Sequence, residues 1–390
     1  MTSPPTLLLV SKYALYPPHW RAMSEICNRY SVRAAVIAAA PPELPAVHQQ
    51  LGWIDLQTAR DESFAPDIRL LPETDKRKRR VWLAQTLAEI QPDAIWLQQE
   101  PTESLSLDVL RVFRHDRRRN PSGPRIVSAV CENIFRPGPP WRKFARSALW
   151  SRLDTLLATS QESIHGIRHA GMPRSVPAET LVAGMEGPPD NVEPLPMPVG
   201  NDPDRFLIGF AGRICHEKGW KVLLEAIRSL DPRFCVALAG SGPQDHELKQ
   251  WCEESEFRHR VHHVGLLPKA DLWRFYQAVD CLVLPSLTLP RWKEQFGGVL
   301  ADAMAMGLPI VGSDSGAIPE VIGPAGRITP EGDSQALAAA LIELDSDREL
   351  AARIGHLSRT RFDNEFSIPA YARKIASSLR LPELHASKVA

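Results

Sequence analysis

The sequence predicts an α/β protein of two doubly wound domains, each a parallel sheet with helices on both faces. Its 390 residues exceed the ~250 to 300 residues at which a single core stops growing. Short β-rich runs alternate with amphipathic helical segments through both halves, and this order is typical of parallel sheets. A polar, proline-rich segment at 186–204 separates the halves and cannot form a helix or a central strand, so it is the expected linker.

The first half is expected to form one domain over 1–185. Its β-rich runs predict strands at 6–10, 32–40, 93–99, 125–130, 155–160 and 179–184. Segments with helical periodicity, such as KRRVWLAQTLAEI (78–90) and SLSLDVLRVFR (104–114), lie between these runs.

The second half repeats the alternation and is expected to form a domain over 205–365. Strands are predicted at 206–214, 234–240, 261–265, 281–286 and 309–313, with helices such as 219–230 and 269–279 between them. A last helical segment within 366–390 lies beyond the final βα unit. We expect it to pack back on the first domain.

The composition narrows the class of protein. Hydrophobic residues make up 44% and charged residues 24% of the chain, and no run reaches the ~18 apolar residues of a membrane span. The first residues predict a strand, not a signal peptide, so the expected location is the cytoplasm. The six cysteines lie singly without a CxxC pair, which argues against a zinc site or a disulfide framework, and we expect them to be reduced and buried.

Two cations follow the first strand of the second half. In FAGRICHEKGW, Gly212, Arg213, Lys218 and Gly219 are expected at a strand-to-helix turn. Arginine offers a bidentate fork, lysine a point charge, and a helix N-terminus free N–H groups, a combination that suits a diphosphate. The alternative is a surface turn with solvated charges.

The next two turns are also rich in glycine. AGSGP (239–243) and VGLLP (264–268) each place a glycine just past a strand, where backbone groups can contact a base. These turns contain Gly242 and Leu266, our candidate donor-binding positions there. The GxGxxG fingerprint of a dinucleotide site is absent.

The stretch EQFGGVLADAMAMGLPIVGSDSGAIPE contains two carboxylates, Glu294 and Asp302. On one helix they would lie ~12 Å apart along the axis, beyond the ~5 to 9.5 Å that separates glycosidase carboxylates. They are better placed to hold opposite ends of an elongated ligand. Gly297 and Gly298 are expected to begin the helix and to direct free N–H groups toward that ligand. The alternative is that Asp302 is simply an exposed helix residue.

These motifs together resemble a known family. PS at 285–286, EQFGGVLADAMAMGLPIV at 294–311, SxSGxIPE at 313–320 and GRIxxEKG at 212–219 look like the family-4 retaining glycosyltransferases of GT-B fold, which have two Rossmann-like domains. The resemblance implies a nucleotide-diphosphate sugar as co-substrate, no metal or other cofactor, and transfer with retention of configuration. The sequence leaves the nucleotide open between UDP and GDP types.

The resemblance also implies roles for single residues. Arg213, which follows Gly212, and Lys218 would neutralise the diphosphate. Glu294 would bind sugar hydroxyls, and Asp302 would bind the ribose diol. The backbone amides expected to contact sugar and phosphate are those of Phe296, Gly297, Gly298 and Val299.

Three features depart from the family pattern. Asp302 stands where the family usually has glutamate, and SKYALYPPHW offers Lys12 where the family has a glycine-rich loop. CENIF stands where many members have a histidine, so Glu132, Asn133 or a backbone group would take that role. Glu132 is either a polar contact on the acceptor side or the partner of a nearby arginine. Glu100 in QQEP either faces the acceptor or forms a structural ion pair.

The net charge of zero hides a basic segment. Residues 111–152 contain eleven Lys and Arg against two acids. The helix expected at 141–157 places Phe144, Leu149 and Leu153 on one face, and this face either packs on the core or docks on an anionic membrane holding a lipid-linked acceptor. The second alternative would place the protein peripherally on the inner face of the cell membrane. No recognised nucleic-acid-binding module accompanies the charge.

The predicted function is sugar transfer from a nucleotide donor to an acceptor hydroxyl in the synthesis of a glycan, a glycolipid or a cell-envelope polysaccharide. Two alternatives stay open. A nucleotide-sugar epimerase of similar architecture would need no acceptor, and a non-catalytic module would bind the nucleotide without turnover. The departures at Asp302 and CENIF motivate the second alternative.

Overall fold

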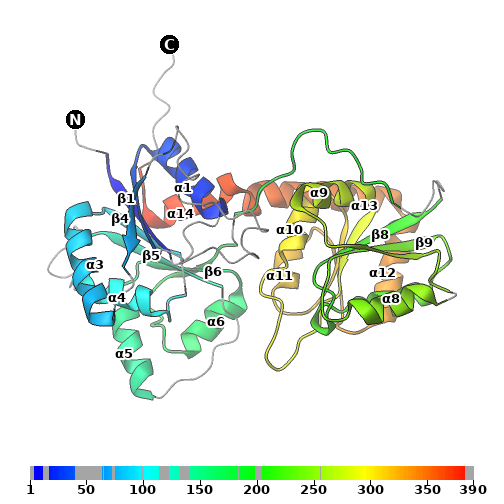
Figure 1. The fold of residues 1–390 in the computed structure, drawn as a ribbon, viewed down its shortest axis with the longest axis horizontal. Helices are drawn as coiled ribbons and strands as arrows, with labels where there is room; N and C mark the ends of the chain where they lie inside the picture. Colours follow the sequence, from blue (N-terminus) through cyan, green and yellow to red (C-terminus); the bar gives the residue numbers. More distant parts are fainter. Residues whose placement is uncertain are drawn as a thin grey trace, which may run out of the picture. The chain divides into compact units, whose positions relative to one another are not determined.

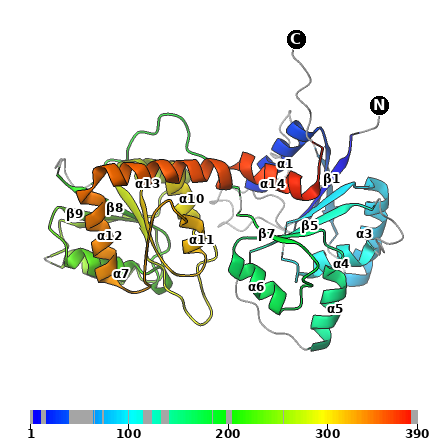
Figure 2. The same ribbon diagram turned by 180° about the vertical axis from the view of Figure 1, so that it is seen from behind.

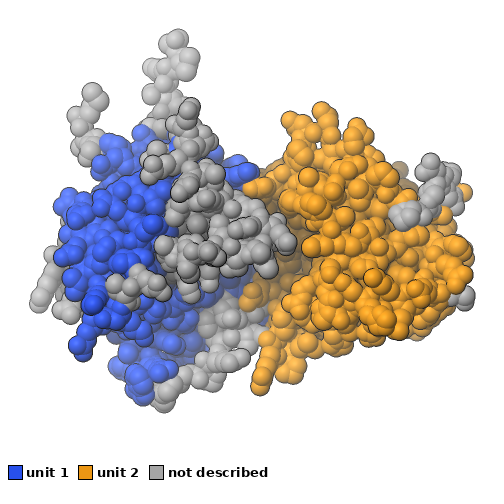
Figure 3. All heavy atoms as spheres, viewed as in Figure 1, with its two compact units in different colours: residues 1–184, 368–390 blue, residues 185–367 orange. Residues whose placement is uncertain are grey.

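The computed structural model describes residues 4–11, 17–39, 64, 66–72, 75–98, 100–113, 123–131, 140–182, 184–197, 204–254 and 256–382. The chain forms two compact units, which are coloured separately in Figure 3. The first unit combines Met1–Gly184 with Ile368–Ala390, and the second is Met185–Ser367. The described part of the expected linker belongs to the second unit, where the Leu195 N–H donates to the Arg274 carbonyl at 2.8 Å. None of the described helices is both long and apolar enough to cross a membrane.

The first unit is a seven-stranded parallel sheet with the strand order β3-β2-β1-β4-β5-β6-β7 (Figure 1). Its strands are β1 (Thr6–Ser11), β2 (Arg33–Ala39), β3 (Asp67–Leu71), β4 (Ala94–Leu97), β5 (Arg125–Val130), β6 (Thr155–Ala158) and β7 (Ala178–Thr180). Its helices are α1 (Pro17–Tyr30), α3 (Lys76–Ile90), α4 (Ser104–Val112), α5 (Pro140–Trp150), α6 (Gln161–His169) and α14 (Ile368–Leu379).

The helix α14 completes one face of this sheet although it follows the whole second unit in sequence. It packs against α1, β4 and β5, and Figure 2 shows it beside α1. Its apolar residues Tyr371, Ile375 and Leu379 belong to the same core cluster as Trp96. The Tyr371 hydroxyl also donates to Gln98 Oε1 at 3.1 Å.

The second unit is a six-stranded parallel sheet with the order β10-β9-β8-β11-β12-β13. Its strands are β8 (Phe206–Ala211), β9 (Phe234–Ala239), β10 (Val261–Gly265), β11 (Cys281–Leu284), β12 (Ile310–Ser313) and β13 (Arg327–Thr329). Its helical segments are η1 (His216–Lys218), α7 (Trp220–Arg228), α8 (Asp245–Glu253), α9 (Lys269–Ala278), α10 (Gly298–Ala305), α11 (Ile318–Ile322), α12 (Ser334–Ser346), α13 (Arg348–Arg361) and η2 (Phe362–Phe366).

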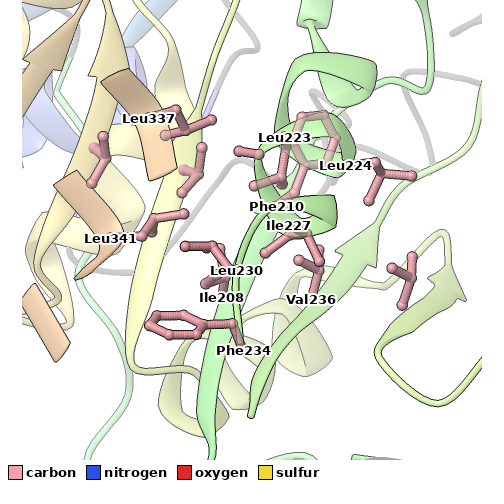
Figure 4. Close-up of a cluster of buried hydrophobic side chains, with 14 of the residues drawn as sticks. Ile208, Phe210, Leu223, Leu224, Ile227, Leu230, Phe234, Val236, Leu337 and Leu341 are labelled. Atoms are coloured by element: carbon pink, nitrogen blue, oxygen red, sulfur yellow. The ribbon is translucent and has the colours of Figure 1, made fainter. Parts of the chain in front are cut away.

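The core of the second unit forms where helices cover the central strands. In Figure 4, Leu223 and Leu224 of α7 and Leu337 and Leu341 of α12 lie against β8, represented by Ile208. All five side chains are almost fully buried. Burying a leucine or isoleucine stabilises the fold by about 1.5 to 3 kcal/mol, so this cluster holds the central strands and the turns that follow them in place.

Most predicted strands and helices are confirmed, but the short edge strands β3 and β13 were missed. The expectation of buried cysteines is wrong for Cys131, which is exposed, and for Cys27 and Cys252, which are half-buried. The core-facing interpretation of the basic helix is wrong for its first two turns. There Phe144 is exposed, whereas Trp150 and Leu153 at the other end of the segment are buried.

Candidate functional site

The candidate site lies where the strand order of the second unit reverses. The strands β8 and β11 are hydrogen-bonded neighbours although about seventy residues separate them. Successive strands are added outward from this pair, β9 and β10 on one side and β12 and β13 on the other. Open parallel sheets bind their ligands beyond the carboxyl ends of the strands at such a switch point. The segments that follow β8 and β11 are therefore the first place to look for a site.

Backbone contacts hold these two segments together. Gly219 has φ +68°, and a Cβ at this position would lie 1.8 Å from the Pro285 carbonyl oxygen. The Leu287 N–H also donates to the Glu217 carbonyl at 2.9 Å. Only glycine tolerates both this conformation and this close approach. Gly219 therefore fixes the distance between the loop after β8 and the loop after β11.

An ion pair joins the side chains of these loops. Lys218 Nζ lies 2.6 Å from Glu294 Oε2, and the Ser286 hydroxyl donates to the same carboxylate oxygen at 2.9 Å. Glu294 is only 6% exposed. A buried carboxylate needs such partners. The structure thus brings together the residues predicted to bind phosphate and sugar.

The two predicted cations differ in their surroundings. The Lys218 ammonium also lies over the Trp292 ring, 5.1 Å from its centroid, whereas Arg213 is exposed. The pKa of the Glu217 carboxyl is lowered, chiefly by a hydrogen bond from its own backbone N–H, then by one from the Cys215 thiol and by the charges of Arg213 and Lys218, while burial opposes the shift. The turn after β8 therefore carries one fixed cation and one solvent-facing cation.

The second predicted carboxylate is buried and paired. Asp302 is 5% exposed and accepts a hydrogen bond of 2.7 Å from Lys269 Nζ, which lies 4.2 Å from the centroid of the Trp273 ring. The interpretation of Asp302 as an exposed helix residue is therefore wrong. Burial raises the pKa of Asp302 and the charge of Glu186 adds to the rise, while Lys269 opposes it. Burial, and then the charge of Asp302, also raises the pKa of Tyr276 well above its ordinary value.

The helix α10 begins where the paired glycines predict. Gly297, with φ +73°, precedes it, and Gly298 is its first residue. Its N-cap residue Gly297 has no side chain to cap this N-terminus, and the first amides of a helix have no acceptor within it. Val299 follows in the first turn, and Phe296 packs against Phe366 with 5.9 Å between ring centroids. Asp302 lies on α10 but Glu294 lies in the preceding loop, so the helical rise does not set their separation.

The glycine-rich turns lie close to the same loops. A Cβ on Gly240 would lie 1.8 Å from the Gly212 carbonyl oxygen, and one on Gly242 would lie 2.3 Å from the Ile214 carbonyl oxygen. The Gly242 N–H is already used by Asp245 Oδ1 at 2.8 Å. Leu266 is 73% exposed, which leaves its side chain available for contact with a ligand.

The first unit gives one described candidate. Glu100 Oε1 accepts a hydrogen bond of 2.7 Å from the Cys131 N–H, so Glu100 connects the ends of β4 and β5. This is a structural contact with a backbone amide. Glu132, Asn133 and Lys12 lie outside the described residues.

Three residues of the site were not identified from the sequence. Ser286 was quoted within a motif without a role, and Lys269 and Trp292 were not singled out. Lys269 follows β10 by four residues at the same sheet edge as Lys218, and this placement past a strand was the available signal.

Comparison with known families identifies the second unit. Residues 193–361 match the family model of the glycosyl transferases group 1. The second unit is a glycosyl transferases group 1 domain. The resemblance of the motifs to glycosyltransferases is thereby confirmed, and the switch-point loops belong to this glycosyltransferase domain.

Two curated relatives of the glycosyltransferase domain are named as biosynthetic glycosyltransferases. The chain is 32% identical over 173 residues to the amylovoran biosynthesis glycosyltransferase AmsK of Erwinia amylovora, covering 43% of this chain and 42% of that protein. It is 28% identical over 328 residues to the lipopolysaccharide core biosynthesis mannosyltransferase LpsB of Rhizobium meliloti, covering 80% and 83%.

A solved structure extends the similarity to both units. The HepE protein of Anabaena in complex with UDP matches with a TM-score of 0.68 and 19% identity, covering 96% of this chain and 99% of that one. Its complex with UDP-glucose matches with a TM-score of 0.62, 20% identity and the same coverage. The predicted GT-B fold, two Rossmann-like units in one chain, is confirmed.

Proposed function

We propose that this protein transfers a sugar from a nucleoside-diphosphate sugar to an acceptor hydroxyl in the synthesis of a cell-surface polysaccharide or lipopolysaccharide. The observation that carries the proposal is the Lys218–Glu294 ion pair between the loops after β8 and β11 of the glycosyltransferase domain. The named activities of the two curated relatives support the polymer class.

The arrangement suits a donor that carries a diphosphate next to a sugar. Arg213 and Lys218 would neutralise the diphosphate, and the charge of a leaving phosphate would grow beside these two cations. Once phosphate oxygens share the Lys218 ammonium, Glu294 can accept hydrogen bonds from the sugar hydroxyls while Ser286 keeps its carboxylate in place.

The start of α10 supplies the remaining contacts. The free amides around Gly297 and Gly298 favour an anion, because a helix N-terminus carries a partial positive charge. Asp302, held by Lys269, would accept hydrogen bonds from the ribose diol. Aspartate is shorter than the glutamate that the family usually has at this position. Lys269 nevertheless contacts the carboxylate of Asp302, and this supports a ribose contact there.

The proposed transfer retains the anomeric configuration and needs no metal. The bond between the anomeric carbon and the phosphate oxygen breaks, and a bond from the acceptor oxygen forms on the same face. The acceptor's proton passes to the departing phosphate, so no side chain has to act as a base. The family resemblance is the support for this step.

Titration calorimetry with UDP, GDP, ADP and TDP tests the donor class. We expect UDP to bind, because the HepE protein of Anabaena was solved with UDP and with UDP-glucose. Binding should be lost in an Arg213→Ala/Lys218→Ala variant. Failure of all four nucleotides to bind the wild type would contradict the proposal.

A turnover assay separates transfer from the alternatives. Release of free nucleoside diphosphate only in the presence of an acceptor supports a transferase. Conversion of the donor sugar without an acceptor would indicate an epimerase, and tight nucleotide binding without any turnover would indicate a binding module.

A further inference from the structure

The first two turns of α5 expose aromatic side chains that the helical pattern predicted to be buried. Phe144 is 84% exposed and Trp141 is 67% exposed, and they lie three residues apart, hence on one side of the helix. The helix is anchored at its other end, where Trp150 is buried and its indole N–H donates to the Pro101 carbonyl at 3.1 Å. The beginning of α5 therefore presents two aromatic rings to solvent while its end is fixed to the core of the first unit.

Cations accompany these rings. The exposed turns contain Arg142, Lys143 and Arg146, and α5 contains no acidic residue. Arg142 lies over the Trp141 ring, 5.2 Å from its centroid. A Cβ on Gly171 would lie 2.6 Å from Lys143 Cγ, so the stem of Lys143 packs closely against the turn after α6.

We propose that Trp141, Arg142, Lys143, Phe144 and Arg146, together called the α5 tip, bind the surface of an anionic lipid bilayer. Exposed aromatic rings gain free energy when they enter the headgroup region, and neighbouring cations are attracted to anionic lipids. Both contributions act at the same place on one anchored helix. The inference does not depend on the proposed function, because it concerns a surface of the first unit.

The shape of the α5 tip favours a bilayer over a protein partner. The eleven residues of α5 extend ~16 Å at the rise of an α-helix, and only the first two turns are free of the core. A stable protein interface needs about 800 Å² on each partner, far more than two turns of helix supply. A bilayer requires only that the side chains at the tip be able to enter it.

Sedimentation with vesicles tests the inference on the full chain. The vesicles are phosphatidylcholine alone or phosphatidylcholine mixed with phosphatidylglycerol, at an ionic strength of about 0.15 M. We expect the wild type to sediment with the anionic vesicles only. Neutralising the tip by Arg142→Gln, Lys143→Gln and Arg146→Gln should lower the partition coefficient on the order of a hundredfold.

An aromatic variant separates the two contributions. Trp141→Ala with Phe144→Ala should lower the partition coefficient by at least about tenfold while leaving all three cations in place. The matched control neutralises exposed cations of the second unit, by Lys249→Gln, Arg258→Gln and Arg353→Gln, and should bind vesicles as the wild type does. Circular dichroism establishes that each variant is folded.

Three results would overturn the inference. The first is a wild type that shows no preference for anionic vesicles, and the second is tip variants that bind them as well as the control does. Loss of binding in the charge variant alone, with the aromatic variant unaffected, would instead indicate a site for soluble polyanions.

Discussion

Lys218 and Glu294 form an ion pair of 2.6 Å across two loops that are 76 residues apart in sequence. The cation assigned to the donor's phosphate is thus neutralised by the carboxylate assigned to its sugar. A donor that carries both groups can compensate both partners at once, whereas a free nucleotide compensates only Lys218. We therefore expect the pair to favour the complete donor over its nucleotide fragment.

Replacing Lys218 should separate binding from folding. Lys218→Ala removes the phosphate cation, and we expect turnover to fall by about a hundred- to a thousandfold. The carboxylate of Glu294 still accepts the hydrogen bond from Ser286, so the free energy of unfolding should fall by only about 1 to 3 kcal/mol. The control is Lys221→Ala, which breaks the half-buried pair with Glu247 and should leave turnover unchanged. Unchanged kinetics in Lys218→Ala would remove the diphosphate assignment.

Ser286 should act through Glu294 on the sugar and not on the nucleotide. In Ser286→Ala the carboxylate loses the hydrogen bond from this hydroxyl, and we expect KM for the nucleotide sugar to rise about tenfold. The Kd for free UDP should stay the same, because Lys218 and Arg213 are intact. The matched control is Ser346→Ala, which removes a hydroxyl bonded to the Ile342 carbonyl at 2.7 Å. An equal loss of UDP affinity in Ser286→Ala would indicate general disruption of the loop.

The affinity for UDP should weaken on acidification through Asp302. Burial raises the pKa of this carboxyl above its ordinary 3.8, so it takes up its proton at a higher pH than an exposed aspartate does. The protonated group accepts hydrogen bonds from the ribose more weakly, and the wild type should lose affinity as the pH falls through this raised pKa. Asp302→Asn should bind UDP more weakly at neutral pH. The pH profile of UDP affinity in Asp302→Asn also serves as the control for the titration of UDP itself. If that profile runs parallel to the profile of the wild type, Asp302 does not have the proposed role in binding the ribose.

The same titration should affect stability with a defined sign. Because the pKa of Asp302 is higher in the folded chain than in the unfolded chain, the folded state binds the extra proton. The free energy of unfolding contributed by this group therefore decreases as pH rises from the unfolded to the folded pKa and is constant above it. Denaturant unfolding of the wild type against Asp302→Asn measures this difference. Asp271→Asn, which removes the exposed partner of Arg274, should show no such trend.

Gly219 should be sensitive to a single methyl group. Both Gly219 (φ +68°) and Gly332 (φ +75°) adopt left-handed conformations, but a Cβ on Gly332 meets nothing within 4 Å. Gly332→Ala should lower the free energy of unfolding by about 1 to 2 kcal/mol through backbone strain alone. Gly219→Ala should lower it by at least about 2 kcal/mol more and reduce turnover, since the loop must move away from Pro285. Equal effects would show that the close contact is not maintained.

The sequence identified the elements of the site better than its contacts. Local patterns placed Lys218 after a strand and Gly298 at a helix start, and both positions are confirmed, because glycine and charge at a turn are local signals. The Lys218–Glu294 pair was not predicted. It depends on β8 lying beside β11, and that neighbourhood comes from the crossover of the sheet, which no local pattern contains.

Periodicity failed for α5 for a related reason. Phe144, Leu149 and Leu153 do share a helical face, but the core reaches only the later part of that face. Whether the early part is covered depends on where the neighbouring elements end. The burial of Asp302 was likewise unpredicted, because it depends on the packing around α10.

The path of the chain has a consequence for its synthesis. The helix α14 fills the core beside α1, but all of Met185–Ser367 is translated between the β-sheet of the first unit and this helix. At ~5 to 20 residues per second, the ribosome needs roughly 10 to 40 seconds to make the intervening unit. During that time the apolar face of β4 and α1 lacks its cover, while the second unit, being contiguous, can fold on its own. The first unit to be translated is thus the last to be completed.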